Sequence, residues 1–368
     1  MKIVIACILA LHGLIHLMGF AKAFNYATIS QLTQPISKPI GSLWLLATLL
    51  FLVSLALFLL NKEGWWLIAT AAIVLSQILI FKSWTDAKFG TLANVVILVP
   101  VIIALMGSLP SSFKNRYEAE VIKRLNNNET VSILTESDIA QLPLPVQRYL
   151  YFTDAVGKPK VYNSRSVFSG QMKQDKKEKW IPIHSKQYNF IREPARVFYI
   201  KSALFGIPFD GLHLFAEGNA TMQIKLAHLF QVADAKGEKM NQSETVTIFN
   251  DMCLMAPATL IDKNIQWETV DSLTVKARFT NGANTLSATL LFDERGALIN
   301  FISDDRYLSA DGKKYERYTW STPIKSYQNF NGRNVCSEAD AIWHMPEGEF
   351  IYANFNLEAI EYNCTEFK

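Results

Sequence analysis

Hydrophobic residues follow two different patterns along the chain, and the change falls near residue 110. The first part holds four apolar runs, each of about the 17–25 residues that a helix needs to cross a bilayer. The runs are Ile3–Phe20, Leu43–Leu60, Trp65–Phe81 and Leu92–Leu109. They predict an α-helical transmembrane module of four helices over residues 1–110. No small-residue cleavage pattern follows the first run, so we expect an uncleaved first helix rather than a signal peptide.

Two histidines lie inside the first apolar run, four residues apart. His12 and His16 therefore share one face of the predicted helix. Ionisable groups within a membrane are candidate functional sites, and such a pair could bind a metal or haem, or relay protons. The alternative is hydrogen bonding between helices, which stabilises bundles.

The basic residues between the runs bear on orientation. Four crossings place the N-terminus and the following domain on the same side of the membrane. Six basic residues lie on that side and four on the other. The six are Lys2, Lys62, Lys114, Arg116, Lys123 and Arg124, and the four are Lys22, Lys38, Lys82 and Lys88. The positive-inside rule favours a cytoplasmic domain, and the small difference leaves the opposite side open.

From about Tyr162 onward, hydrophobic and polar residues alternate with a period of two. The segments 273–279 and 351–359 are clear examples. Such alternation is typical of half-buried antiparallel strands, and Gly-containing turn pairs such as Asn281-Gly282 separate them. We predict an α+β soluble domain over residues 137–368, built on a curved, half-barrel-like antiparallel meander of ten to twelve strands. Residues 111–136, with the run 126–128 of three asparagines, are predicted to form a juxtamembrane linker.

One helix is predicted to interrupt the sheet. Ser243 is a suitable N-cap, apolar residues follow at helical spacing, and Pro257 ends the run. Such a helix is expected to lie across the concave face of the sheet. The space beneath it is either a filled core or an apolar pocket. The candidate ligand-binding residues are Trp180, Phe198, Phe215, Phe230, Phe249 and Met252, with Phe190, Phe205 and Phe209 as further lining candidates.

Two groups of polar residues are further candidates for a site. Asp304, Asp305 and Arg306 form the densest charged cluster, and His344 is a possible neighbour. This cluster could bind a head group or a metal, or form a local ion pair in a turn. Glu244 and Asp251 lie seven residues apart on one helix face. They could serve as an acid–base pair, or they could lie on a solvated helix face.

Several kinds of site find no support in the sequence. Residues 1–107 carry a net charge of +4 and the remainder −1, which gives no electrostatic footprint for nucleic acid. The four cysteines include no CxxC pair, and phosphate-binding loops are absent. We therefore expect no metal, cofactor or nucleic acid. Cys336 and Cys364 either form a disulfide or remain free buried thiols.

Several short motifs carry a family resemblance that covers nearly the whole chain. They are His12-Gly13-Leu14-Ile15-His16, Asp86-Ala87-Lys88-Phe89-Gly90-Thr91, Leu142-Pro143 with Arg148-Tyr149-Leu150, Trp180-Ile181-Pro182, Asp304-Asp305-Arg306-Tyr307, Trp343-His344 and Gly348-Glu349-Phe350. Their order resembles an uncharacterised family of bacterial multi-pass membrane proteins whose C-terminal part is a domain of unknown function. The resemblance implies a bacterial inner-membrane location and assigns no chemical role to any residue.

The layout of the soluble part also resembles the lipid-binding half-barrels of periplasmic lipoprotein carriers. This likeness implies a membrane-anchored protein that binds a lipid or another apolar ligand beside the bilayer. Two alternatives remain: a structural or interaction protein without a cavity, and an enzyme acting on a membrane-associated substrate. The enzyme hypothesis requires ionisable groups such as Glu244, Asp251, Asp304, Asp305, Arg306 and His344 to converge.

Overall fold

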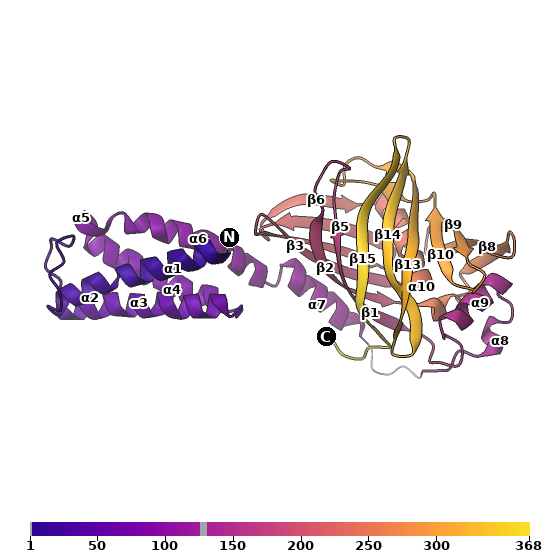
Figure 1. Cartoon of the computed structure of the whole chain (residues 1–368), viewed down its shortest axis with the longest axis horizontal. Coiled ribbons are helices and arrows are strands. Elements are labelled where there is room, and N and C mark those ends of the chain that lie inside the picture. The colour runs from indigo at the N-terminus through magenta and orange to yellow at the C-terminus, as the bar shows by residue number, and fades with distance from the viewer. Residues whose placement is uncertain (1, 126–130) are drawn as a thin grey trace. The chain divides into compact units, whose positions relative to one another are not determined.

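The computed structural model describes residues 2–125 and 131–368, and the chain divides into two compact units between Ser112 and Phe113 (Figure 1). The first unit is helical and the second is built on a large sheet. The asparagine run 126–128 of the predicted linker lies outside the described residues. Within that predicted linker, residues 113–124 form helix α7, which belongs to the second unit.

The first unit contains the four predicted membrane spans. Its helices are α1 (Lys2–Ile15), α2 (Leu17–Ala23), α3 (Lys38–Leu59), α4 (Trp65–Lys82), α5 (Trp84–Ala87) and α6 (Gly90–Ser108). Four stretches among the described residues are long and apolar enough to cross a membrane, and they begin at Lys2, Lys38, Trp65 and Gly90. The prediction of a membrane module is therefore confirmed.

The first span is interrupted at His16, between α1 and α2. The Nδ1 atom of His16 lies 2.7 Å from the carbonyl oxygen of His12, so the side chain competes for a carbonyl of its own helix. The backbone N–H of His16 instead donates to the carbonyl of Gly13. A side chain that enters the helical hydrogen-bond ladder is an established cause of such breaks.

Close packing of α2 against α3 depends on two glycines. A Cβ atom on Gly19 would lie 2.2 Å from the ring of Trp44, and one on Gly41 would lie 2.2 Å from Cβ of Ala23. Small residues let membrane helices approach closely, which strengthens dispersion contacts between them.

The second unit contains one antiparallel sheet of thirteen strands in the order β6-β5-β4-β3-β2-β1-β15-β14-β13-β10-β9-β8-β7, and it is not closed. These strands are β1 (Asn163–Met172), β2 (Ile181–Phe190), β3 (Ala195–Leu204), β4 (Ile207–Ala216), β5 (Asn219–Leu226), β6 (Phe230–Lys236), β7 (Ile265–Thr269), β8 (Thr274–Asn281), β9 (Asn284–Phe292), β10 (Leu298–Ser303), β13 (Thr319–Phe330), β14 (Arg333–Met345) and β15 (Gly348–Tyr362). The short strands β11 (Tyr307–Leu308) and β12 (Glu316–Arg317) form a separate pair. The fold class is confirmed, with more strands than the ten to twelve predicted.

The sheet consists of two meanders joined in its middle. Strands β1–β6 form one half, and strands β7–β10 with β13–β15 form the other. Strand β1 pairs with β15 from Ser164↔Tyr362 to Met172↔Ala353. Strands β6 and β7 lie at the two opposite edges of the sheet, but they follow one another in the chain. Helix α10 (Glu238–Met255) lies between them in the sequence. The inserted helix thus runs from one open edge to the other.

Helix α10 begins earlier than the sequence indicated. Its N-cap is Gly237, at φ +91°, and not Ser243. The Ser243 hydroxyl instead donates to the carbonyl of Lys239, one turn earlier in the helix, at 2.8 Å. Met240 extends the apolar surface of the helix by another turn and is buried. The reason for the error is that a good capping residue can equally satisfy its hydroxyl within a helix.

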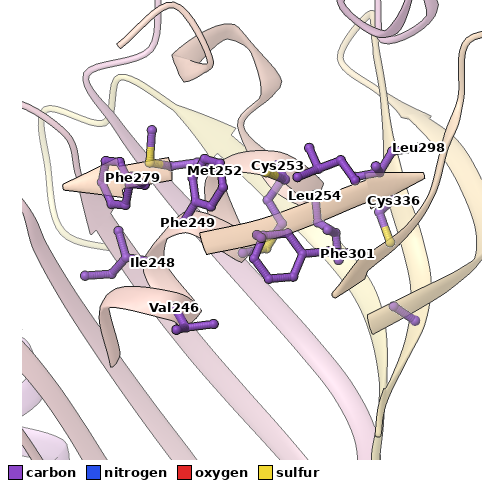
Figure 2. Close-up of a cluster of buried hydrophobic side chains, with 14 of the residues drawn as sticks. Val246, Ile248, Phe249, Met252, Cys253, Leu254, Phe279, Leu298, Phe301 and Cys336 are labelled. Atoms are coloured by element: carbon purple, nitrogen blue, oxygen red, sulfur yellow. The ribbon is translucent and has the colours of Figure 1, made fainter. Parts of the chain in front are cut away.

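The main core lies between α10 and the inner face of the sheet. Figure 2 shows Phe249, Met252 and Cys253 of α10 among side chains from the second meander. The Phe249 ring stacks on Phe279 at 5.1 Å and meets Phe301 edge-on at 5.7 Å. Fourteen of the 18 residues of α10 are buried, so the helix presents no broad solvated face.

Three further helices cover other surfaces of the domain. Helix α7 (Phe113–Arg124) packs Phe113, Tyr117 and Val121 against side chains of β2, β3 and β4. The short helix α8 (Glu136–Ile139) and helix α9 (Leu144–Phe152) precede β1. Tyr149 of α9 is fully buried and donates from its hydroxyl to the carbonyl of Cys253 at 2.7 Å, which ties α9 to α10.

Candidate functional site

A buried ion cluster lies between α10 and the first meander. Arg196 of β3 donates from Nη1 to Oε1 of Glu244 at 2.5 Å, and from Nε to Oδ2 of Asp251 at 2.8 Å. The amides of Gln187 and Asn189 on β2 also donate to Oδ2 of Asp251, at 2.6 and 3.1 Å. Glu244 and Asp251 are only 2 % and 6 % exposed, so the interpretation of a solvated helix face is wrong.

The charge states of this cluster follow from burial and pairing. Burial alone would raise the pKa of Glu244, but Arg196 and His213 outweigh it and hold that pKa at about 2. Burial raises the pKa of Asp251, and Arg196 offsets this only in part. Burial lowers the Arg196 pKa, but its two carboxylates outweigh that effect and raise it. The guanidinium and the Glu244 carboxylate are therefore ionised together.

His213 of β4 lies at the margin of the ion cluster. Its Nδ1 atom is 3.9 Å from Oε2 of Glu244, and its side chain is 21 % exposed. Burial lowers the pKa of His213 below its usual 6.5, and the nearby Glu244 carboxylate compensates only in part. The imidazole is therefore neutral at pH 7. The Phe198 ring meets His213 edge-on and also lies 4.7 Å from the Arg196 guanidinium carbon.

Arg306 forms a second polar centre. It lies near enough to the ion cluster for its charge to lower the pKa of both Glu244 and His213. Its guanidinium carbon lies 4.1 Å from the Trp320 ring centre and 5.3 Å from that of Trp343. The Nη1 atom donates to the hydroxyl of Tyr352 at 2.9 Å. Among the described residues no carboxylate forms an ion pair with Arg306, and its buried Nε has no acceptor.

The hydroxyl of Tyr352 also has hydrogen-bonding capacity that the described protein groups do not fill. It accepts hydrogen bonds from Arg306 and from Nε1 of Trp320, the latter at 3.3 Å. Its own proton has no acceptor among the side chains and backbone that the structure describes. Two donors, Nε–H of Arg306 and O–H of Tyr352, therefore lie in one neighbourhood beside two tryptophan rings. Such an arrangement suits an acceptor that carries negative charge.

The six predicted ligand-binding residues do not lie together. Phe215, Phe249 and Met252 are buried in the main core, while Phe198 packs with Ile183 and Ile200 in a smaller cluster. Trp180 and Phe230 are exposed at the ends of hairpins. Of the further candidates, Phe190 is buried beside α7, Phe209 is half-buried and Phe205 is almost fully exposed.

The predicted polar cluster is divided between the surface and the interior. Asp305 pairs with Arg317 at 2.6 Å, and Asp304 accepts from the Thr319 hydroxyl. Arg306 alone turns toward the tryptophans. His344 contacts the hydroxyl of Ser321 at 2.8 Å and is a third exposed. Of the residues named in the enzyme hypothesis, only Glu244 and Asp251 are brought together, through Arg196, while Arg306 acts on Glu244 through its charge alone.

In the membrane module, His12 and His16 take part in a hydrogen-bonded cluster. The Nε2 atom of His12 lies 2.9 Å from Oδ1 of Asn94 on α6, and Nε2 of His16 lies 2.9 Å from Oγ of Ser76 on α4. Asn94 also donates to Ser76 and to Gln77, both at 3.0 Å. The pair thus forms hydrogen bonds between helices, the second of the two interpretations.

Three other features bear on the predicted sites: groups of metal ligands, the cysteines and a surface hollow. Across residues 2–125 and 131–368, no three His, Cys, Asp or Glu side chains are arranged to hold a metal ion. Cys336 and Cys364 are free and buried, in different clusters. A surface hollow of about 470 Å³ lies around Leu134, Tyr151 and Gly157, and none of the predicted ligand-binding residues lines it.

Sequence reasoning missed Arg196, His213 and Tyr352. Arg196 and His213 lie on the neighbouring strands β3 and β4, Tyr352 lies on the distant strand β15, and only the sheet brings them near α10. One signal was present: Ser185, Gln187 and Asn189 alternate at inward positions of β2. Polar residues at buried strand positions indicate a polar partner in the interior.

The comparison with protein families covers most of the soluble unit. The model of the family of unknown function DUF6544 matches residues 132–355. This stretch contains the ion cluster, α10, Arg306 and Tyr352. No curated protein matches the chain. The chain therefore belongs to the family DUF6544, as a membrane-anchored member in which the family model matches the second unit.

Proposed function

We propose that this protein is a membrane-anchored binding protein for a lipid or similar apolar molecule with an anionic head group. One observation carries the proposal: Arg306 and Tyr352 each hold a donor without an acceptor, beside the rings of Trp320 and Trp343. The head group would accept from these donors, and the apolar part would lie against aromatic side chains.

The charges around Arg306 support an external anion. The acidic neighbours of Arg306 in the sequence are already engaged, since Asp305 pairs with Arg317 and Asp304 accepts from Thr319. Glu244, the buried carboxylate that feels the charge of Arg306, is paired with Arg196. A guanidinium held against two tryptophans without its own carboxylate is a recurrent means of binding carboxylate or phosphate.

The test is photo-crosslinking of the full chain in nanodiscs with a diazirine-bearing palmitic acid. We expect labelling of peptides that contain Trp320, Trp343 or Tyr352. Arg306→Gln should lower that labelling about tenfold, because one charge-assisted contact is worth roughly 1.5–3 kcal/mol. A diazirine-bearing fatty alcohol, which lacks the anion, should label weakly and should not respond to the substitution.

Arg317→Gln is the matched control. Arg317 lies eleven residues further along the chain (317 − 306 = 11). Its side chain is 55 % exposed and forms an ion pair with Asp305. This variant should label as the wild type does. Absence of labelling on these peptides, or equal labelling of the wild type and Arg306→Gln, would refute the proposal.

A further inference from the structure

Five hairpins of the soluble domain turn at the same end of the strands, and one of them, the β8–β9 hairpin, has only Gly282 and Ala283 between its strands. The strand register places the ends of the other four, β1–β2, β3–β4, β5–β6 and β14–β15, together there. We call this end of the strands, at the four hairpins just named, the hairpin edge, and define it as residues 172–181, 201–209, 225–232 and 345–349. The turn between β7 and β8 lies at the opposite end of the strands, since the strand directions alternate across the sheet.

Large apolar side chains are exposed along the hairpin edge. Phe205 is 90 % exposed and Phe230 is 65 % exposed, and Trp180, beside the third turn, is 37 % exposed. Leu204 and Leu229 accompany them. Isolated apolar residues on a surface are ordinary, but aromatic residues on three neighbouring tips mark an interaction surface.

The backbone at Phe205 strengthens this interpretation. Phe205 and Gly206 occupy a two-residue turn with φ of +51° and +81°. A left-handed conformation suits Asn or Gly at such a turn and is unfavourable for a bulky side chain. Phe205 is therefore both strained and exposed to water in the isolated domain, and neither feature contributes to folding stability. Strained residues of this kind concentrate at functional sites.

The charges on the hairpin edge match an anionic lipid surface. It carries six lysines and four acidic residues, a net charge of 6 − 4 = +2. Lysines 173, 176, 177 and 179 flank Trp180, and Nζ of Lys173 lies 4.7 Å from its ring centre. Aromatic rings that enter the interfacial region, with lysines directed at head groups, are typical of membrane-surface contacts.

The chain itself enters the domain near this edge. The ring of Phe113, the first residue of α7, lies 4.7 Å from Nζ of Lys225, and Arg116 donates to Gln223 at 2.9 Å. Both contacts fall at the end of β5 that leads into the hairpin edge. Only residues 109–112 separate α7 from the membrane helix α6. An extended chain covers at most about 3.5 Å per residue, so the connection between these two helices is short.

We propose that the hairpin edge docks on the surface of the bilayer in which the protein is anchored, with Phe205, Phe230 and Trp180 in the interfacial region and the lysines on anionic head groups. This contact would hold the soluble domain in one orientation against the membrane. It does not depend on the ligand-binding proposal, because a domain can lie on a bilayer without taking up a lipid.

The test uses the full chain reconstituted in vesicles of phosphatidylcholine and phosphatidylglycerol. Cys7→Ala removes the exposed native thiol, since the other three cysteines are buried. Ala203→Cys then carries a bimane probe next to intact Leu204 and Phe205. Brominated acyl chains should lower the emission of this probe about twofold, as expected for an interfacial position. A probe at Val270→Cys, an exposed apolar position in the β7–β8 turn, should not be quenched.

The variant Phe205→Asn, Phe230→Gln should remove the quenching at residue 203. Asn is favoured at the positive φ of residue 205, so this variant keeps the fold while it removes the anchors. Omitting phosphatidylglycerol should weaken the quenching in the wild type. Equal quenching at residues 203 and 270, or none at either, would overturn the proposal. A probe at 203 shielded from both bromolipid and aqueous iodide would also overturn it, because a second protein copy would then cover the edge.

Discussion

Both units bury polar clusters, but they bury different kinds of group. The membrane module uses His12, His16, Ser76 and Asn94, which bond to one another across three helices. The soluble domain uses Arg196 with Glu244 and Asp251, an ion cluster in a region shielded from water. The comparison shows two solutions to the same problem, the placement of hydrogen-bonding groups away from solvent.

The donors and acceptors of the membrane cluster can be assigned from its geometry. Nδ1 of His16 faces a backbone carbonyl, so it must donate, and Nε2 of the same ring then accepts from Ser76. We expect such a network to tolerate the loss of one member, because comparable contacts between membrane helices contribute only about 0.6–2 kcal/mol. A charge cluster does not, since removal of one partner leaves an uncompensated charge.

The largest effect should come from Arg196→Met. This change leaves Glu244 and Asp251 buried without their counter-ion, and the free energy of unfolding should fall by about 3–5 kcal/mol. Urea unfolding of the full chain in nanodiscs, followed by tryptophan fluorescence, measures the change. Arg317→Met, at an exposed pair, should cost less than about 1 kcal/mol. Similar losses in the two variants would show that the buried cluster is energetically ordinary.

A smaller effect is expected from Asn94→Leu in the membrane module. The variant removes contacts with His12, Ser76 and Gln77, and comparable polar contacts between membrane helices contribute about 0.6–2 kcal/mol. Thermal denaturation in detergent should show a modest loss of stability. Thr70→Leu is the control, because Thr70 is exposed and bonds only within its own helix, to the carbonyl of Trp66. A loss as large as that of Arg196→Met would erase the contrast between the units.

The smallest effect concerns pH and His213. The folded protein resists protonation of this ring, whereas the unfolded chain accepts a proton near pH 6.5. Acidification below 6.5 therefore favours unfolding, by at most about 1.4 kcal/mol per pH unit for one proton. Glu244, with its pKa of about 2, stays ionised over this range.

Unfolding measured between pH 7 and pH 5 should thus show a steeper loss of stability in the wild type than in His213→Gln. The difference between the two curves isolates the contribution of this histidine. Parallel curves would mean that His213 accepts a proton as readily in the folded domain as in the unfolded chain.

The architecture was accessible from the sequence because its signals are local. Four long apolar runs and alternating segments need no knowledge of distant partners, and both predictions agree with the structure. The start of α10 was misplaced because Ser243 satisfies a capping rule but bonds within the helix. The number of strands in the sheet was too low, since a short strand such as β7, with 5 residues, carries too few residues for a periodic pattern.

The candidate site was only partly accessible, because it depends on the order of strands. Glu244 and Asp251 were identified as a pair by their spacing, yet Arg196 pairs with them across 48 and 55 residues. Arg306 was noted for its charge, whereas its two tryptophans come from other strands. The exposure of Phe205 was not foreseen, since an aromatic residue in a strand-rich segment ordinarily points to a core.

The junction of the two meanders has a consequence for biosynthesis. One side of strand β1 cannot form its hydrogen bonds until β15 has been synthesised. The first paired residues, Ser164 and Tyr362, are separated by 362 − 164 = 198 residues of sequence. Pairing over such a distance is slow, because a long loop must close before the contact forms. The membrane helices are made first, so an incomplete sheet with unpaired strands would stand beside the bilayer until residue 362 has been added. We expect this nascent stage to be the point at which the chain most needs a chaperone.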